Sequence, residues 1–283
     1  MPNRAQLTDN TAHLVDALLP AVLAAARVQM HYFRVGCAVL TKTDASPVTA
    51  ADHESEALIL QALAHHMPGV PVIAEEAAAA GHLPSINQTP DLEFFLVDPL
   101  DGTREFVNGR PEFTINIALV RAGIPRFGLI YVPATGQLFA TLGNHHAIEA
   151  HIDATQTAPR LADLNARHIQ TRRPPSSGLV AVASRSNHAP GADAFLGQYT
   201  VIQRTSAGSS LKFCLVAQGA ADIYPRVGPT CEWDTAAGHA IVSAAGGSVT
   251  QLDGQPLVYG NAAAKFLNPD FVAWGRQPLA PQH

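Results

Sequence analysis

The stretch Leu-Glu-Phe-Phe-Leu-Val-Asp-Pro-Leu-Asp-Gly-Thr occupies residues 92–103. Residues 92–97 are nearly all apolar, which is typical of a short strand buried on both faces of a sheet. Asp98-Pro99 bounds the strand, because proline has no N–H to donate to a neighbouring strand. We therefore expect a ligand site at the carboxyl end of this strand.

Two carboxylates stand at that end, separated by a constrained turn. Pro99 restricts the backbone and Gly102 can adopt angles closed to other residues, so Asp98 and Asp101 can point into one pocket. Hard oxygen ligands of this kind suit Mg²⁺, and the Leu100 carbonyl would lie between them.

Residues 102–106 look like the start of a helix, whose free backbone N–H groups and dipole favour a phosphate oxygen. The pattern Asp-Pro-x-Asp-Gly also forms ordinary turns, so by itself the segment is as compatible with a plain turn as with a site. The interpretation as a site depends on further acids elsewhere in the chain.

Other acidic residues are placed at the ends of expected elements. Glu75-Glu76 follows a short expected strand, and Asp234 lies at the start of an expected helix. Taken alone, the two glutamates are expected to be solvated surface charges, and Asp234 is expected to be a helix N-cap. Together with the two aspartates above, these acids could surround two or three cations, whose charge would offset the repulsion between carboxylates.

Hydrophobic periodicity predicts helices at 8–34, 52–67, 209–218 and 233–245. Short apolar or alternating runs predict strands at 71–74, 92–97, 114–120, 127–132, 137–141, 179–183, 222–224 and 248–252. Pro20 implies a kink or a late start in the first helix. The segment 42–51 is expected to be an exposed loop or hairpin, and Lys42 is expected to be solvated, with a phosphate or nucleotide contact as the alternative. Residues 151–178 are expected to link two halves.

The 283-residue chain has 47% hydrophobic and 14% charged residues, enough to bury a substantial core. Its net charge of -5 argues against a nucleic-acid polymer as partner. The apolar stretch 14–28 contains charged residues and is shorter than the roughly 20 residues that cross a bilayer, so we expect a core-facing helix and no transmembrane segment. Cys37, Cys214 and Cys231 have neither zinc nor redox spacing, and we find no export signal. These features favour a cytoplasmic protein, with peripheral attachment at the inner face of the membrane as an alternative.

The sequence resembles the inositol monophosphatase superfamily in the order and separation of three motifs. These are Ala-Glu-Glu at 74–76, Asp-Pro-Leu-Asp-Gly-Thr at 98–103 and Glu-Trp-Asp-Thr-Ala-Ala-Gly at 232–238. The segments 42–52, 208–214 and 222–226 look specifically like the branch of 3'(2'),5'-bisphosphate nucleotidases of the CysQ type. The likeness extends from about residue 42 to residue 247.

The resemblance implies an α/β (α+β) layered sandwich of the inositol monophosphatase/fructose bisphosphatase kind, with two subdomains. Residues 1–150 would form an N-terminal α+β subdomain with most of the metal ligands. Residues 178–275 would form a C-terminal α/β subdomain that supplies Asp234 and the nucleotide contacts. The two would act as a single phosphatase unit, and a homodimer is compatible with the resemblance.

The resemblance also implies a role for each site residue. Two or three Mg²⁺ ions would be bound by Glu75, Asp98, the Leu100 carbonyl, Asp101 and Asp234. The catalytic residues would be Asp52, Thr103 and Glu75, of which the first two position and activate the attacking water. The substrate would be held by Gly102, Thr103, Ser186, Ser209, Lys212, Arg226 and Asp234.

One departure from the branch concerns the Ser-Arg-Ser motif at 184–186. Asn187 follows this motif where many relatives have histidine, and His188 comes next. The contributions of Asn187 and His188 to nucleotide binding therefore stay open.

The implied function is Mg²⁺-dependent hydrolysis of the 3'-phosphate of adenosine 3',5'-bisphosphate to AMP and phosphate, which recycles a by-product of sulfate assimilation. An inositol monophosphatase would share all the metal ligands, and a non-enzymatic regulatory module could use the same fold. The segment 208–226 favours the nucleotide. The preference among adenosine bisphosphate, phosphoadenylyl sulfate and inositol phosphates stays open.

Overall fold

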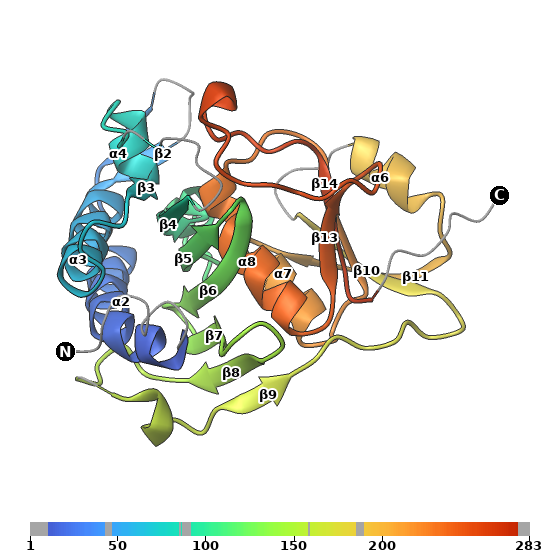
Figure 1. Ribbon diagram of the computed structural model, residues 1–283, viewed down its shortest axis with the longest axis horizontal. Helices are drawn as coiled ribbons and strands as arrows, with labels where there is room; N and C mark the ends of the chain where they lie inside the picture. The colour runs from blue at the N-terminus through green and yellow to red at the C-terminus, as the bar shows by residue number, and fades with distance from the viewer. Residues whose placement is uncertain are drawn as a thin grey trace.

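The computed structural model describes residues 11–42, 47–84, 86, 92–157, 159–184 and 190–276. Within these residues the chain forms two large β-sheets with helices between them and on the outer face of each (Figure 1). This arrangement is the mixed α/β layered architecture that the sequence predicts.

Helices α2 (Thr11–Val35) and α3 (Ala50–His66) pack together over the outer face of the larger sheet (Figure 1). Leu14, Leu18 and Val22 of α2 are fully buried, which confirms the expected core-facing helix. Pro20 lies inside α2, so the helix does not start late. By length and composition α2 could cross a bilayer, but half of its most apolar window is buried, which is the pattern of a core helix.

The larger sheet has the strand order β3-β4-β5-β6-β7-β8-β9 within the described residues. Its strands are β3 (Val72–Ala74), β4 (Glu93–Asp101), β5 (Thr114–Arg121), β6 (Ile124–Val132), β7 (Gln137–Thr141), β8 (Ala147–His151) and β9 (Arg167–Ile169). β3 is parallel to β4, and the later pairs are antiparallel, which confirms the expected meander. Side chains of β4 alternate between two cores. Phe95 and Val97 face α2 and α3, whereas Phe94 and Leu96 face the second sheet.

The smaller sheet has the strand order β11-β10-β12-β14-β13 in the part of the chain that is described. Its strands are β10 (Leu179–Ser184), β11 (Val201–Ala207), β12 (Ile223–Arg226), β13 (Ser248–Gln251) and β14 (Phe271–Trp274). Helices α7 (Leu211–Ala217) and α8 (Glu232–Ala244) lie between the two sheets (Figure 1). Phe213 and Ile241 of these helices share one hydrophobic core with Leu96 and Phe271, so both sheets are held by the same core.

Short elements place residues at one edge of the larger sheet. α4 (Glu75–Ala79) directly follows β3, and α5 (Thr103–Val107) follows β4 after one residue. Because β3 and β4 are parallel neighbours, α4 and α5 begin at the same edge. β1 (Val39–Thr41) and β2 (Pro47–Thr49) form the expected hairpin, of which residues 43–46 lie outside the described part.

Most predicted elements are present with ends shifted by a few residues, but α4, β8, β9, β11, β14 and α6 (Pro190–Leu196) were not predicted. β11 is an edge strand with mostly exposed side chains, so it lacks the apolar pattern from which strands were predicted. Residues 151–178, expected as a linker, contribute β9 to the larger sheet, and 3-10 turns occur at Leu161–Asp163 and Ala262–Ala264.

We expect Gly128→Ala to lower the free energy of unfolding by about 1–3 kcal/mol. A Cβ atom at this β6 position would lie 2.3 Å from the Ala237 carbonyl oxygen of α8, so the helix would have to move away from the sheet. Gly197→Ala is the matched control, since its Cβ would have nearest contacts of 3.4 Å, and its effect should stay within about 0.5 kcal/mol. Urea unfolding measures both variants, and equal stability would contradict the close approach of α8 to β6.

Candidate active site

The turn at residues 98–101 interrupts the pairing between β4 and β5. Asp98 and Asp101 each pair with a β5 residue, and the register shifts between them. Residues of the shifted segment leave the ladder, so their backbone groups need other partners. The Leu100 N–H donates to Asp98 Oδ1 at 3.0 Å, and the Leu100 carbonyl accepts from Thr103 Oγ1 at 3.2 Å.

Gly102 connects this turn to α5 and confirms the expected helix start. Its φ is +91°, in the left-handed region that favours glycine. A Cβ atom there would lie 3.2 Å from the Glu112 carbonyl oxygen, which is closer than most Cβ contacts. Glycine therefore lets α5 begin beside the turn, with Thr103 as its first residue.

Asp52 lies at the start of α3 and contacts Thr103, although the two residues are 51 positions apart. Asp52 Oδ2 accepts the Thr49 N–H at 2.8 Å and the Thr49 hydroxyl at 2.7 Å, which closes a capping box. Its other oxygen, Oδ1, accepts from Thr103 Oγ1 at 3.1 Å. Burial raises the pKa of Asp52, and the hydrogen bonds from the two threonines oppose that rise.

Lys42 is ion-paired with Glu75 and Glu76, so the expectation of a solvated Lys42 is wrong. Lys42 Nζ lies 2.6 Å from Oε1 of each glutamate, and the Lys42 side chain is only 10% exposed. Burial raises the pKa of Glu76 to about 7, against the opposing effect of Lys42. The prediction failed because a lysine in a polar loop shows no partner in the sequence, whereas the fold places it against α4.

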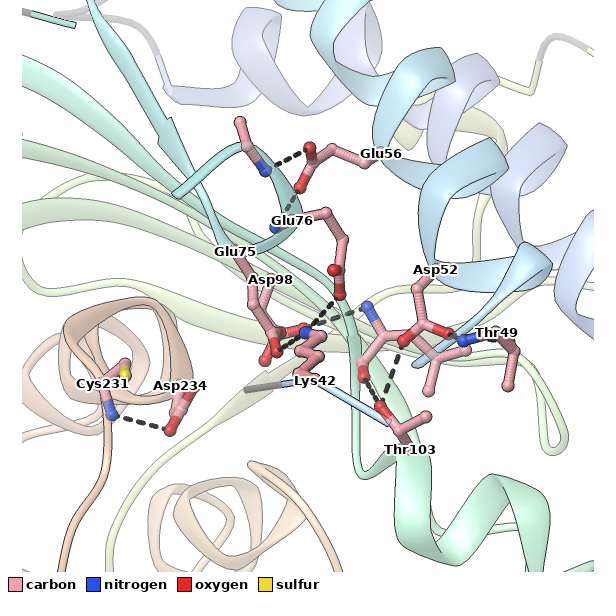
Figure 2. Close-up of polar contacts among 12 residues, drawn as sticks. Lys42, Thr49, Asp52, Glu56, Glu75, Glu76, Asp98, Thr103, Cys231 and Asp234 are labelled. Carbon is pink, nitrogen blue, oxygen red and sulfur yellow. Dashed lines mark hydrogen bonds and ion pairs between the residues drawn. The ribbon is translucent and has the colours of Figure 1, made fainter. Parts of the chain in front are cut away.

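Asp98, Asp101 and Asp234 add three carboxylates to Glu75. Asp234 is the third residue of α8 and not its N-cap, which is Cys231, and its carboxylate accepts the Cys231 N–H at 2.9 Å as in a capping box. Burial raises the pKa of Asp98 well above its usual range, and the charges of Glu75, Asp101 and Asp234 raise it further. Burial, followed by the charges of Asp101 and Glu75, likewise raises the pKa of Asp234. Figure 2 shows Asp234 on α8 across from Glu75 and Asp98, which come from the larger sheet's edge.

The chemistry of this donor set fits a divalent cation. The four side chains are carboxylates, the ligands that Mg²⁺ prefers over thiolate or imidazole. In the positions that the described side chains occupy, no three Asp, Glu, His or Cys residues converge closely enough to hold an ion. A bound cation would therefore draw the carboxylates together, and its charge would offset the repulsion that raises their pKa values.

Ser209, expected at the substrate, makes a hydrogen bond to Asp101. The Ser209 hydroxyl donates to Asp101 Oδ2 at 2.8 Å. The φ of Ser209 is +52°, a left-handed backbone conformation that is uncommon outside glycine and concentrates at functional sites. The segment 208–214 is thus connected directly to the turn at residues 98–101.

Lys212 lies within this segment, and the charge of Arg226 acts on it from β12. Lys212 Nζ donates to the Ser209 carbonyl and lies 5.5 Å from the centre of the Tyr224 ring. Burial lowers the pKa of Lys212 to about 8. Arg226 Nη2 donates to the Pro229 carbonyl at 3.1 Å. The remaining expected contact, Ser186, lies outside the described residues, as do Asn187 and His188.

Thr114 and Asn116 of β5 complete the polar network, although neither was expected from the sequence. Both are fully buried. Asn116 Oδ1 accepts from Ser210 Oγ at 2.7 Å and from Thr114 Oγ1 at 3.0 Å, and Asn116 Nδ2 lies 3.4 Å from Asp101 Oδ2. Thr114 Oγ1 also contacts the hydroxyls of Ser209 and Ser210. Two polar residues at alternate positions of an apolar strand were the signal that could have found them.

Glu56 of α3 holds the first turn of α4 and was also not identified from the sequence. Its carboxylate accepts the Glu76 N–H at 2.8 Å and the Ala77 N–H at 2.9 Å (Figure 2). The first N–H groups of a helix have no acceptor within it, so a carboxylate there stabilises the helix start. Glu56 follows Asp52 by one helical turn, and this spacing was the available signal.

Carboxylates that face one another from the edge of the larger sheet and from α8 define the class of this site as that of a metal-assisted hydrolase. The model of the inositol monophosphatase family matches residues 10–271. The chain belongs to the inositol monophosphatase family, which confirms the resemblance drawn from its motifs.

Individual relatives and structures agree with this membership. The chain is 42% identical over 235 residues to the 3'(2'),5'-bisphosphate nucleotidase CysQ of Escherichia coli strain K12, covering 82% of this chain and 87% of the relative. The crystal structure of CysQ from Bacteroides thetaiotaomicron matches with a TM-score of 0.76 and 33% identity, over 93% of this chain and 97% of that one. An inositol monophosphatase from Anabaena matches with a TM-score of 0.68 and 25% identity, over 93% and 91% of the two chains. The predicted layered fold is thereby confirmed.

We expect Glu56→Ala to lower the kcat/KM of phosphate release by about 10- to 100-fold. The substitution removes the acceptor of two α4 N–H groups, and Glu75 lies at the first position of that helix. Glu54→Ala is the matched control on the same helix, because Glu54 is exposed and accepts from the Tyr32 hydroxyl at 2.6 Å. Steady-state kinetics at saturating Mg²⁺ compares them, and equal activity of both variants would refute a positioning effect of Glu56.

Proposed function

We propose that this protein is a Mg²⁺-dependent phosphatase that hydrolyses the 3'-phosphate of adenosine 3',5'-bisphosphate to AMP and phosphate. The observation that carries the proposal is the 42% identity to a 3'(2'),5'-bisphosphate nucleotidase over 82% of the chain, in a fold that gathers four carboxylates. The reaction would recycle a by-product of sulfate assimilation, in the cytoplasm.

Two or three Mg²⁺ ions would be held by Glu75, Asp98, the Leu100 carbonyl, Asp101 and Asp234. When bound, Mg²⁺ supplies positive charge to the phosphate oxygens and lowers the pKa of an attacking water. Thr103 donates its hydroxyl hydrogen toward Asp52 and the Leu100 carbonyl, so its oxygen can accept a hydrogen from the water. Asp52 would orient Thr103 and take part in the removal of that proton.

The substrate would lie between the carboxylates and the segment 208–226. Gly102 and Thr103 would contact the phosphate that is removed, and Asp234 would also lie near the nucleotide. Lys212 and Arg226 would supply positive charge toward the nucleotide, while Ser209 would join the nucleotide segment to Asp101. Ser186 is proposed as a further contact from the motif alone. We propose that residues 1–150 and 178–275 act as subdomains of a single phosphatase unit, and that two such units could pair as a homodimer.

Two other functions compete with this proposal. An inositol monophosphatase would use the same carboxylates, and the family includes such enzymes among the structural neighbours. A regulatory module would keep the fold without needing hydrolysis. Burial and mutual repulsion raise the pKa values of Asp98 and Asp234. Carboxylates with such raised pKa values are concentrated at functional sites, which favours an enzyme.

We expect Mg²⁺-dependent release of phosphate from adenosine 3',5'-bisphosphate to exceed that from inositol 1-phosphate and fructose 1,6-bisphosphate by at least about 10-fold in kcat/KM, as a nucleotide-specific segment predicts. Purified protein is assayed with each substrate, with Mg²⁺ and with a chelator. Faster hydrolysis of inositol 1-phosphate would overturn the nucleotide assignment, and inactivity on all three would favour the regulatory module.

We expect Asp98→Asn to reduce that activity by at least about 100-fold, because a neutral amide is a poor Mg²⁺ ligand. Asp253→Asn is the matched control, since Asp253 is exposed in a turn and its Oδ1 accepts the Gln255 N–H at 2.9 Å. The same phosphate-release assay measures both, and a fully active Asp98→Asn variant would exclude Asp98 as a metal ligand.

A further inference from the structure

Gln29 of α2 is fully buried and reaches the turn at residues 98–101. Its Nε2 donates to the Pro99 carbonyl at 2.7 Å and to Ser55 Oγ at 3.1 Å. The register shift between Asp98 and Asp101 removes the Pro99 carbonyl from the β4–β5 ladder. The Gln29 side chain therefore supplies the donor that a neighbouring strand would otherwise have given.

The orientation of the Gln29 amide follows from the chemistry of its partner. The Pro99 carbonyl can only accept a hydrogen bond, so the amide must present its NH₂ group to it. In that orientation Oε1 is buried without a hydrogen-bond partner among the described residues. Leaving a buried acceptor unpaired is unfavourable, so the donor to Pro99 is the contact that this side chain provides.

The position of the Pro99 carbonyl affects the positions of the groups on both sides of it. It lies between two proposed Mg²⁺ ligands, the Asp98 carboxylate and the Leu100 carbonyl. The second partner of Gln29, Ser55, belongs to α3, the helix that also carries Asp52. A single amide thus connects α2 and α3 to the backbone between the ligands.

We propose that Gln29 is a positioning residue of the metal site. Its hydrogen bond to Pro99 fixes the path of the turn, so that the Asp98 and Asp101 carboxylates and the Leu100 carbonyl keep the relative positions that a cation needs. The inference rests on the proposed function, because it takes these groups as metal ligands. Outer hydrogen bonds of this kind typically change metal affinity by 10- to 100-fold.

Gln29→Met tests this inference, because methionine keeps the length of the side chain and removes the donor. Binding of MnCl₂ to the full chain is followed by electron paramagnetic resonance without substrate, and MgCl₂ is used as competitor. We expect the Kd for Mn²⁺ to rise about 10-fold or more. The Mg²⁺ concentration for half-maximal hydrolysis should rise in parallel, while the KM for the nucleotide at saturating Mg²⁺ changes less.

Val22→Ala is the control, because Val22 is fully buried in the same helix and packs in the core of α2, α3 and the sheet. It should lower thermal stability while the Kd for Mn²⁺ stays within about twofold of the wild type. A core substitution that does not contact the metal site affects folding but not Mn²⁺ affinity. Should Gln29→Met fail to fold, Gln29→Asn keeps an amide but is one methylene too short to reach Pro99, and it should give the same rise.

The possible results separate the two hypotheses. Unchanged Mn²⁺ binding by the Gln29 variants, or equal weakening by Val22→Ala, would overturn the positioning role and leave the proposed function standing. A wild-type protein that binds neither Mn²⁺ nor Mg²⁺ would overturn the proposed function, and the positioning role with it.

Discussion

The candidate site depends on one physical constraint, the electrostatic repulsion between buried carboxylates. Glu75, Asp98, Asp101 and Asp234 come from three separate elements, and burial and neighbouring negative charge raise the pKa values of Asp98 and Asp234. Such a cluster opposes folding unless donors and positive charges are close by. The same cost makes the cluster a strong attractor for a small cation, which is the basis of the proposed chemistry.

Backbone N–H groups at helix starts and in the β4 bulge donate to the carboxylates and so offset part of this repulsion. Asp52 accepts from Thr49, Asp98 accepts from Leu100, and Asp234 accepts from Cys231. Helix starts and bulges are the places where N–H groups lack a partner within regular structure, so acids and unpaired donors satisfy each other there. Lys42 adds a full positive charge against Glu75.

In the proposed function, the two sheets would supply different groups, one set to the metal and the other to the substrate. The edge of the larger sheet carries most of the carboxylates, whereas the segment 208–226 and α8 bring hydroxyl, cationic and carboxylate groups from the other side. The hydrogen bond from Ser209 to Asp101 joins the two sets. Family members that act on different phosphate esters can therefore share the first set and differ in the second, because specificity depends on groups that touch the rest of the substrate.

The sequence by itself determined the motifs and most of the elements that carry them, because these are local. The apolar run before Asp98, the glycine at 102 and the acid at the start of α8 each act within a few residues, and their order was enough to predict the family. Only the tertiary structure decided which buried groups meet. Lys42 contacts Glu75 across 33 positions, Gln29 contacts Pro99 across 70 and Ser209 contacts Asp101 across 108. Sequence spacing carries no signal for such pairs, since they form only when helices and sheets pack, and packing determines which unpaired polar atoms lie within reach of one another.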